Sequence, residues 1–191
     1  MKTLYIIAGP NGAGKTTASY TILPKILNCK EFVNADEIAK GISPFNPDSV
    51  SIQAGKLMLK RIKELLDQGE TFAFETTLSS KSFVIFIQEA KRKNYEVILL
   101  FLMLDSAELA IERVAVRVNE GGHNIPKRVI IRRYQRGLTN FFNLYMNIVD
   151  KWFFVNNSGH YFQFIAEGSK SEFIIKDKEY WYKIKQKYYG N

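Results

Sequence analysis

The chain of 191 residues contains a single cysteine, Cys29, and lacks any long apolar run. One cysteine cannot form an internal disulfide, so a reducing compartment is open to the protein. The longest unbroken apolar stretch, residues 97–104, is far shorter than the roughly 20 residues of a membrane-spanning helix. The sequence also lacks internal repeats, low-complexity linkers and a clear domain boundary. We therefore expect a single cytoplasmic domain over residues 1–191 that does not associate with a membrane.

Hydrophobic residues make up 46% of the chain and charged residues 24%, a balance that is typical of globular proteins and excludes an intrinsically disordered chain. The net charge of +8 is unevenly distributed. Residues 111–136 hold seven lysines and arginines against two glutamates, and residues 170–191 hold six lysines against three acids. Because basic surfaces attract anions, these stretches indicate an anionic partner such as a nucleotide or a nucleic acid, or else a solvated charged face.

Short apolar stretches alternate with helical patterns along most of the chain. The expected strands cover about residues 2–8, 31–34, 71–75, 96–104 and 150–156. Strands that alternate with helices favour βαβ units, so we predict an α/β fold in which a parallel five-stranded sheet lies between two layers of helices. Alternating residues at 161–167 and 172–178 predict a small β-hairpin, and a short helix follows. Together these form an expected C-terminal appendage over about residues 160–191.

Several helix ends can be placed from the residues that cap them. The Asn46-Pro47 pair predicts a helix start, with the asparagine as N-cap and the proline in the first turn, and Gly69 predicts the end of that helix. Asp105 and Glu108 predict a capping pair for another helix. From Pro126 one long helix is expected, because apolar residues recur at helical spacing as far as residue 148.

The clearest motif is a phosphate-binding loop between the first expected strand and the first helix. Residues 9–16 read Gly-Pro-Asn-Gly-Ala-Gly-Lys-Thr and fit the pattern GxxxxGK[ST]. Glycines let backbone N–H groups turn toward phosphate oxygens, and the helix that follows adds the positive end of its dipole. Lys15 can reach the β- and γ-phosphates of ATP, and the hydroxyl of Thr16 can ligate Mg²⁺. The expected nucleotide contacts are Gly9, Pro10, Asn11, Gly12, Ala13, Gly14, Lys15, Thr16 and Thr17.

Acidic side chains stand where expected strands end. In an open parallel sheet, groups at the carboxyl ends of the strands converge on the ligand. Asp36 is placed to accept the hydroxyl proton when a phosphoryl group is transferred to an alcohol, although it could instead cap a helix. Glu75 could contact a substrate hydroxyl or a metal-bound water, or pair with a nearby base. Asp105 could be the Walker-B aspartate of an ATPase, but a helix cap with Glu108 satisfies it equally, and no glutamate follows it directly.

A basic segment over residues 113–136 predicts a lid that closes over the nucleotide. Arg128, Arg132 and Arg136 recur every four residues, and like charges at this spacing destabilise a helix by a few tenths of a kcal/mol unless an anionic ligand offsets them. A glycine pair separates this helix from a second basic one. In the closed lid such arginines would stabilise charge on the transferred phosphoryl group. The candidates for this role are Arg113 or Arg117 before the glycine pair, and Arg132 or Arg133 after it. His123, also in the lid, is assigned to substrate contact, with a local cap or surface role as the alternative.

These motifs in combination resemble those of the zeta-toxin-like P-loop kinases, over roughly residues 1–160. The residues that carry the resemblance are the phosphate loop, Asn34-Ala35-Asp36, Phe74-Glu75-Thr76-Thr77-Leu78-Ser79, Arg117-Val118 followed by Gly121-Gly122-His123 and Ile125-Pro126, and Arg132-Arg133-Tyr134. The resemblance implies a three-layer P-loop NTPase fold and ATP-dependent phosphoryl transfer. Asp36 would be the catalytic base, while Glu75 and Thr76 would contact the substrate and Asn157 would lie in the adenine-contacting loop.

The resemblance also implies an acceptor and a partner. Zeta toxins phosphorylate UDP-N-acetylglucosamine and are held inactive by an antitoxin. We therefore expect a small-molecule acceptor for the phosphoryl group, with such a nucleotide sugar as the first candidate, and an antitoxin protein as an open partner. The chain is expected to be smaller than the zeta toxins proper and to lack their terminal extensions, and Lys56 stands where an arginine is expected. The acceptor and any toxicity therefore stay open.

Two other functions also stay open. A polynucleotide 5′-hydroxyl kinase, or another nucleic-acid-directed enzyme, would use the basic lid and the aromatic tail, which includes Tyr180, Trp181 and Tyr182. These aromatic residues suit a helix packed on the sheet equally well, so nucleic acid is the less favoured partner. A nucleotide-gated ATPase switch would instead use Asp105 as a Walker-B group.

Overall fold

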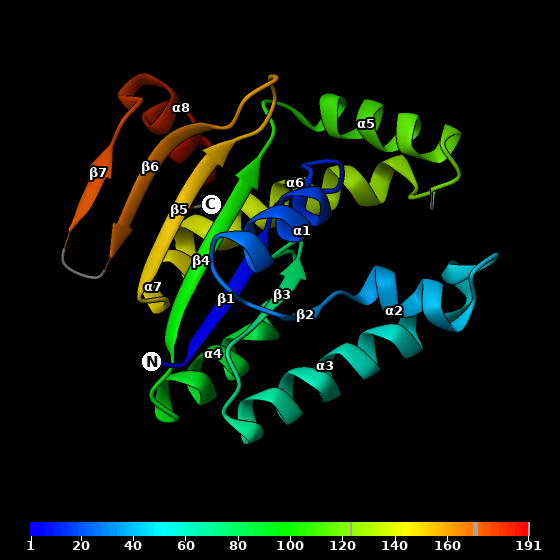
Figure 1. Ribbon diagram of the computed structural model, residues 1–191. Helices are drawn as coiled ribbons and strands as arrows, with labels where there is room; N and C mark the ends of the chain where they lie inside the picture. The colour runs from blue at the N-terminus through cyan, green and yellow to red at the C-terminus, as the bar shows by residue number, and fades with distance from the viewer. Residues whose placement is uncertain (123, 170–171, 191) are drawn as a thin grey trace.

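The computed structural model describes residues 1–122, 124–169 and 172–190. Within them, a seven-stranded sheet with the order β2-β3-β1-β4-β5-β6-β7 forms the centre of the molecule (Figure 1). The strands are β1 (Thr3–Ala8), β2 (Glu31–Val33), β3 (Phe72–Thr76), β4 (Glu96–Met103), β5 (Lys151–Asn156), β6 (Gln163–Ser169) and β7 (Phe173–Ile175). Strands β1 to β5 pair in parallel, whereas β6 and β7 are antiparallel to their neighbours. The predicted α/β fold with parallel strands is confirmed.

Helices cover both faces of this sheet. They are α1 (Lys15–Lys25), α2 (Ala35–Ile42), the 3₁₀-helix η1 (Pro47–Val50), α3 (Ser51–Gln68), α4 (Phe83–Arg92), α5 (Ala107–Asn119), α6 (Lys127–Asn140), the π-helix η2 (Phe141–Tyr145), α7 (Met146–Ile148) and α8 (Lys178–Tyr188). In Figure 1, α1 lies in front of the sheet, and α6 and α8 lie behind it. Over the described part of the chain, no helix combines the length and apolar character needed to cross a membrane.

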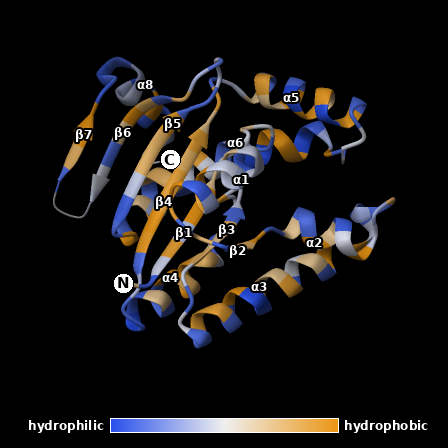
Figure 2. Ribbon diagram, viewed as in Figure 1, coloured by the Kyte–Doolittle hydropathy of each residue, from blue (hydrophilic) through white to orange (hydrophobic). Residues whose placement is uncertain are grey.

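The hydrophobic core is divided between the two faces because successive side chains of a strand point to opposite sides. Leu4 and Ile6 of β1 belong to the larger cluster, whereas Ile7 belongs to a small cluster with Leu23 of α1 and Cys29. Figure 2 shows β4 as hydrophobic over most of its length, as expected for a central strand that is covered on both faces.

The C-terminal hairpin continues the main sheet. Strand β6 pairs with β5, with an irregularity in register between Phe154 and Val155. Helix α8 then returns to the core, where the ring of Trp181 stacks on that of Trp152 with a centroid distance of 5.4 Å. The hairpin and helix are both present as predicted, and the structure makes them part of the central sheet and core.

Two of the predicted helix caps are wrong. Ser106, not Asp105, is the N-cap of α5, because its backbone is extended and its hydroxyl accepts a hydrogen bond from the N–H of Leu109 at 3.1 Å. Asn46 precedes η1 without any cap bond from its side chain, and η1 leads into α3. The proline in the first turn is confirmed, as is Gly69, which ends α3 with a φ of 75°.

The predicted single helix from Pro126 to residue 148 is interrupted. Helix α6 ends at Asn140 and passes into the π-helix η2. Phe141 and Phe142 are both fully buried, and the wider π turn lets two consecutive aromatic rings face the same core. A periodic pattern of apolar residues does not distinguish this turn from regular helix.

Candidate active site

The phosphate loop joins β1 to α1 as predicted, at the carboxyl ends of the strands. Gly9 has a φ of 141°, and a Cβ atom there would lie 1.9 Å from the carbonyl oxygen of Leu102, so only glycine fits. Gly14 has a φ of 76° and stands as the N-cap of α1. A Cβ atom on Gly14 would lie 2.8 Å from the side-chain amide of Asn157. The loop is therefore packed against β4 on one side and the segment after β5 on the other.

Lys15 is buried at the first turn of α1, and only 6% of it is exposed. Its ammonium group donates a hydrogen bond to the carbonyl of Pro10 at 2.9 Å and lies 3.6 Å from Oε1 of Glu75. Burial lowers the pKa of Lys15, and the negative charges of Glu75 and Asp36 oppose that shift. The cation is held inside the loop, where the phosphate groups of a nucleotide would meet it.

Glu75, near the end of β3, contacts three polar side chains of the site. Its Oε2 atom accepts hydrogen bonds from the hydroxyl of Thr16 at 2.8 Å and from the side-chain amide of Asn34 at 2.9 Å. With Lys15 facing Oε1, both carboxylate oxygens have a partner. The alternative that Glu75 pairs with a nearby base is therefore also realised, and the base is the P-loop lysine.

Asp36 lies in the first turn of α2, whose N-cap is Asn34. The side-chain oxygen of Asn34 accepts hydrogen bonds from the backbone N–H groups of Asp36, at 2.8 Å, and Glu37, at 3.4 Å. Because Asn34 caps the helix, the carboxylate of Asp36 is not needed for that purpose. Asp36 instead lines the cavity described next.

A cavity of about 400 Å³ lies over the phosphate loop. It is lined by Asn11, Gly12, Gly14, Lys15, Thr16, Thr17, Asn34, Ala35, Asp36, Met58, Glu75, Thr76, Thr77, Phe83, Arg113, Arg117 and Arg133. A second cavity of similar size extends between α2, η1 and the end of α5. The two cavities share Thr16, Ala35, Asp36 and Arg117. Asp36 thus stands at the junction of two spaces, each large enough for part of a substrate.

The lid arginines divide into two groups. Arg113, Arg117 and Arg133 line the first cavity, whereas Arg132 is exposed and lies outside it. The guanidinium of Arg133 donates to the side-chain oxygen of Asn11 at 3.4 Å; burial lowers its pKa, and the charge of Asp36 opposes that shift. Of this adjacent pair, Arg133 is therefore the arginine that α6 directs toward the cavity.

Arg113 forms hydrogen bonds with the segment that follows β5. Its guanidinium donates hydrogen bonds to the carbonyls of Asn157, at 2.7 Å, and Ser158, at 2.9 Å. The side chain of Asn157 in turn donates to the carbonyl of Ala13 in the phosphate loop at 2.9 Å. These bonds bring Asn157, which was assigned to nucleotide contact, against the loop.

The remaining assigned residues are placed as follows. Thr17 is exposed and lines the first cavity, as does Thr76, whose hydroxyl accepts a hydrogen bond from the backbone N–H of Leu78 at 3.1 Å. Asp105 does not line the first cavity, and its carboxylate bonds to Tyr180 and Asn156 instead. His123 lies outside the described residues.

The structure brings into the site three residues for which the sequence predicted no role. The first is Asn34, although an asparagine between a strand and a helix is a common N-cap signal. Met58 of α3 and Phe83 of α4 form the apolar wall of the first cavity. The local sequence does not predict that these two residues line a cavity, because an apolar residue on a helix is ordinarily expected to pack in the hydrophobic core.

The sequence model of the zeta toxin family matches residues 1–160, which is most of the chain. This chain belongs to the zeta toxin family. Membership of this family implies a P-loop kinase, an ATP-dependent phosphotransferase, which agrees with the prediction from the sequence. An uncharacterized protein of Haemophilus influenzae is 29% identical over 126 residues, which cover 66% of this chain and 88% of that protein.

Solved structures show the same fold. A chain of the AvrRxo1-ORF1:AvrRxo1-ORF2 complex with sulphate ions matches with a TM-score of 0.77 and 18% identity, and one from the same complex with ATP matches with a TM-score of 0.74 and 17% identity. Each match covers 96% of this chain and 63% of the other, so the family member described here spans less than two thirds of their length. A chain of the PezAT toxin–antitoxin system of Streptococcus pneumoniae matches with a TM-score of 0.67 and 17% identity, over 100% of this chain and 80% of that one.

Proposed function

We propose that this zeta toxin-family kinase transfers the γ-phosphoryl group of ATP to a hydroxyl group of a small-molecule acceptor. A nucleotide sugar such as UDP-N-acetylglucosamine is the first acceptor to test. The observation that carries the proposal is the place of Asp36, at the junction of two cavities and beside the phosphate loop. Such an arrangement suits transfer to an alcohol, because a carboxylate between the bound phosphate chain and the acceptor can take the hydroxyl proton.

The basic residues of the first cavity suit the phosphate end of ATP. Backbone N–H groups of the phosphate loop and the N-terminus of α1 would hold the phosphate oxygens. Lys15 would lie against the β- and γ-phosphates. Arg117 and Arg133, which line the same cavity, would stabilise the negative charge that develops during transfer, with Arg113 fixing the wall beside them.

The oxygen atoms around Thr16 suit Mg²⁺. The hydroxyl of Thr16 lies 2.8 Å from Oε2 of Glu75, which gives a hydroxyl and a carboxylate side by side. Over the described residues, no group of three or more acidic, histidine or cysteine side chains could hold a metal alone. Such a donor set fits Mg²⁺, which is usually held by one or two protein oxygens together with phosphates and waters. When bound, the ion would neutralise charge on the β- and γ-phosphates.

Asp36 would act as the general base. Its carboxylate takes the proton of the acceptor hydroxyl while that oxygen forms a bond to the γ-phosphorus, and the bond to the β–γ bridging oxygen breaks to release ADP. Glu75 and Thr76 line the first cavity together with Asp36, and they would orient the acceptor by hydrogen bonds. Asn157 and the segment around it would face the nucleotide base.

An antitoxin is a candidate partner. The AvrRxo1 chain is found in a complex of its two open reading frame products, and the S. pneumoniae chain belongs to a toxin–antitoxin system. By analogy, we propose that a protein encoded next to this chain binds it, which co-purification of the two products would test.

The central experiment replaces Asp36 with asparagine. Wild type and Asp36→Asn are incubated with ATP, Mg²⁺ and a panel of acceptors that includes UDP-N-acetylglucosamine, nucleosides and 5′-hydroxyl oligonucleotides, and products are identified by mass spectrometry. We expect one acceptor to gain a phosphate, and Asp36→Asn to lower that rate by about 10²–10⁴-fold while ATP affinity stays within about twofold.

The matched control is Asp67→Asn, which removes an exposed carboxylate that is paired with Lys93 at 2.6 Å and lines neither cavity. It should retain full activity. Full activity of Asp36→Asn would show that another group is the base. Phosphorylation of the oligonucleotide alone would establish the polynucleotide kinase alternative. The ATPase-switch alternative relied on Asp105 as a Walker-B group. The carboxylate of Asp105 instead accepts hydrogen bonds from Tyr180 and Asn156, and it does not line the first cavity, so this alternative is less favoured.

A further inference from the structure

The segment Asn156–Ser158, which begins at the last residue of β5, is held by hydrogen bonds from several sides. Arg113 holds two of its carbonyls, and Asn157 reaches the phosphate loop at Ala13. The backbone N–H of Asn157 donates to the carbonyl of Met103 at 2.9 Å. Within the segment, the hydroxyl of Ser158 donates to the side-chain oxygen of Asn156 at 2.6 Å. These hydrogen bonds hold the segment as a wall next to the phosphate loop.

Asp105 holds the far side of this wall. Its Oδ1 atom accepts a hydrogen bond from the side-chain amide of Asn156 at 2.8 Å, and its backbone N–H donates to the hydroxyl of Ser158 at 2.8 Å. Asn156 is almost completely buried, with 6% exposed. The carboxylate of Asp105 therefore sets the orientation of Asn156, and with it the path of the backbone into Asn157.

The same Oδ1 atom of Asp105 accepts a second hydrogen bond, from the hydroxyl of Tyr180 in α8, at 2.6 Å. Burial raises the pKa of Tyr180, and the charge of Asp105 raises it further, so the hydroxyl stays protonated and donates. The hydroxyl also lies 3.3 Å from the sulfur of Met103 at the end of β4. Tyr180 comes from the part of the chain that follows residue 160, where the match to the family model ends.

We propose that Tyr180 is a positioning residue of the nucleotide site: through Asp105 it fixes the segment Asn156–Ser158, which faces the nucleotide base. The inference rests on the proposed function, because it takes that segment as the base-contacting wall. Its physical basis is a continuous chain of short contacts from α8 to the phosphate loop. Without the Tyr180 hydroxyl the segment can adopt other conformations. The affinity for ATP then falls in proportion to the fraction of molecules that keep the binding-competent conformation.

The test compares two ligands that differ only in whether they reach the wall. ATP and inorganic tripolyphosphate, each with Mg²⁺, are titrated into the full chain by isothermal calorimetry. Tripolyphosphate can occupy the phosphate loop but has no base. Tyr180→Phe keeps the ring and removes the hydroxyl, so we expect the Kd for ATP to rise about three- to tenfold, while the Kd for tripolyphosphate stays within about twofold.

Variants at Asp105 test the route of the effect. Asp105→Ala should weaken ATP binding at least as much as Tyr180→Phe, and adding Tyr180→Phe to Asp105→Ala should have no further effect, because the two residues act through one contact. Asp105→Asn keeps an oxygen in the Oδ1 position and should bind ATP like wild type. Tyr182→Phe, which removes an exposed hydroxyl two residues further along α8, is the matched control and should change nothing.

Three outcomes overturn the inference: no change of ATP affinity in Tyr180→Phe, an equal loss for ATP and tripolyphosphate, or additive losses with Asp105→Ala. Lys15→Ala separates this failure from failure of the proposed function. If the phosphate site is correct, Lys15→Ala weakens both ligands. If it weakens neither, the proposed nucleotide site is itself wrong.

Discussion

Asn34 shows how one side chain can serve two parts of the site. Its oxygen caps α2 and so fixes the helix that carries Asp36, while its amide donates to Glu75. An asparagine is suited to this because its side chain offers an acceptor and a donor side by side. The positions of Asp36 and of the Glu75 carboxylate beside Thr16 are therefore both set by the same residue.

Replacement of Asn34 should affect stability and activity together. Asn34→Ala removes the cap, and we expect the free energy of unfolding to fall by about 1 kcal/mol, the usual cost of a lost N-cap. It also removes a donor to Glu75, so the phosphoryl-transfer rate should fall. Urea unfolding followed by circular dichroism measures the first effect, and the product assay measures the second.

Asn34→Ser separates the two contributions. A serine caps helices about as well as asparagine, so most of the stability should return. Its short side chain does not replace the amide that donates to Glu75, so the lower rate should persist. Equal stability of the alanine and serine variants would contradict the capping role.

Among single residues, the sequence was most informative where chemistry restricts the choice. Lys15, Thr16, Asp36 and Glu75 all line one cavity, because a phosphate loop and the ends of parallel strands leave few places for charged groups. Arg132 could not be separated from Arg133 without the orientation of α6. The partner of Asp105 could not be found either, since Tyr180 is 75 residues away along the chain.

At the level of elements, α6 supports the segment between β3 and α4. The side-chain amide of Asn140 donates to the carbonyl of Leu78 at 2.6 Å, and the hydroxyl of Tyr145 in η2 donates to the backbone carbonyl of Ser80 at 2.6 Å. A Cβ atom on Gly137 would lie 2.6 Å from the carbonyl oxygen of Thr77. Glycine at this position lets the helix approach a segment that lines the cavity.

Gly137→Ala should therefore destabilise the protein. The added methyl group meets backbone that cannot rotate away, and overpacking of this kind costs about 1–3 kcal/mol. Gly55→Ala in α3 is the matched control, because no atom lies within 4 Å of its added Cβ. The control should gain about 0.5–1 kcal/mol, since alanine favours helix over glycine.

Both changes are measured as shifts in the midpoint of chemical denaturation. A Gly137→Ala protein as stable as wild type would mean that α6 can move away from Thr77 at little cost. The alternation of strands and helices was visible in the sequence, but this approach of α6 to the β3–α4 segment was not, because it depends on a pair of segments 60 residues apart.

Over the whole molecule, the C-terminal segment is built into the core. The rings of Phe142 and Phe154 lie 5.2 Å and 5.5 Å from that of Trp181, which also stacks on Trp152. Alternating residues in the sequence predicted the hairpin, and a helix was expected after it, but the pairing of β6 with β5 was not predicted. The partner of β6 depends on which strand lies at the edge of the parallel sheet. That position is set by the tertiary fold, so a local sequence pattern does not reveal it.

We expect the chain to unfold as one cooperative unit. Its two tryptophans both lie in the C-terminal aromatic cluster, so their fluorescence reports on this part, whereas far-ultraviolet circular dichroism reports on all helices and strands. In a urea titration the two transitions should coincide. A fluorescence transition at lower urea concentration would show that the hairpin and α8 unfold separately.

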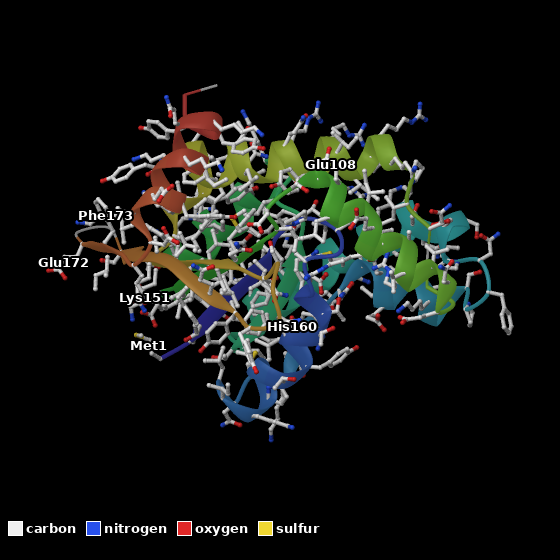
Figure 3. The ribbon with its side chains drawn as sticks, turned by 90° about the horizontal axis from the view of Figure 1, so that it is seen from above. Met1, Glu108, Lys151, His160, Glu172 and Phe173 are labelled. Atoms are coloured by element: carbon white, nitrogen blue, oxygen red, sulfur yellow. The ribbon has the colours of Figure 1, made fainter. Side chains whose placement is uncertain are left out.

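The length of the edge strands of the sheet affects how the protein behaves at high concentration. Both of its outer strands, β2 and β7, have three residues each. Figure 3 shows Phe173 of β7 at the margin of the molecule, where it is 64% exposed. An apolar edge is a template on which another chain could add a strand, but so short an edge offers few backbone groups to pair with. The brevity of these two strands thus protects the protein against fibrous self-association.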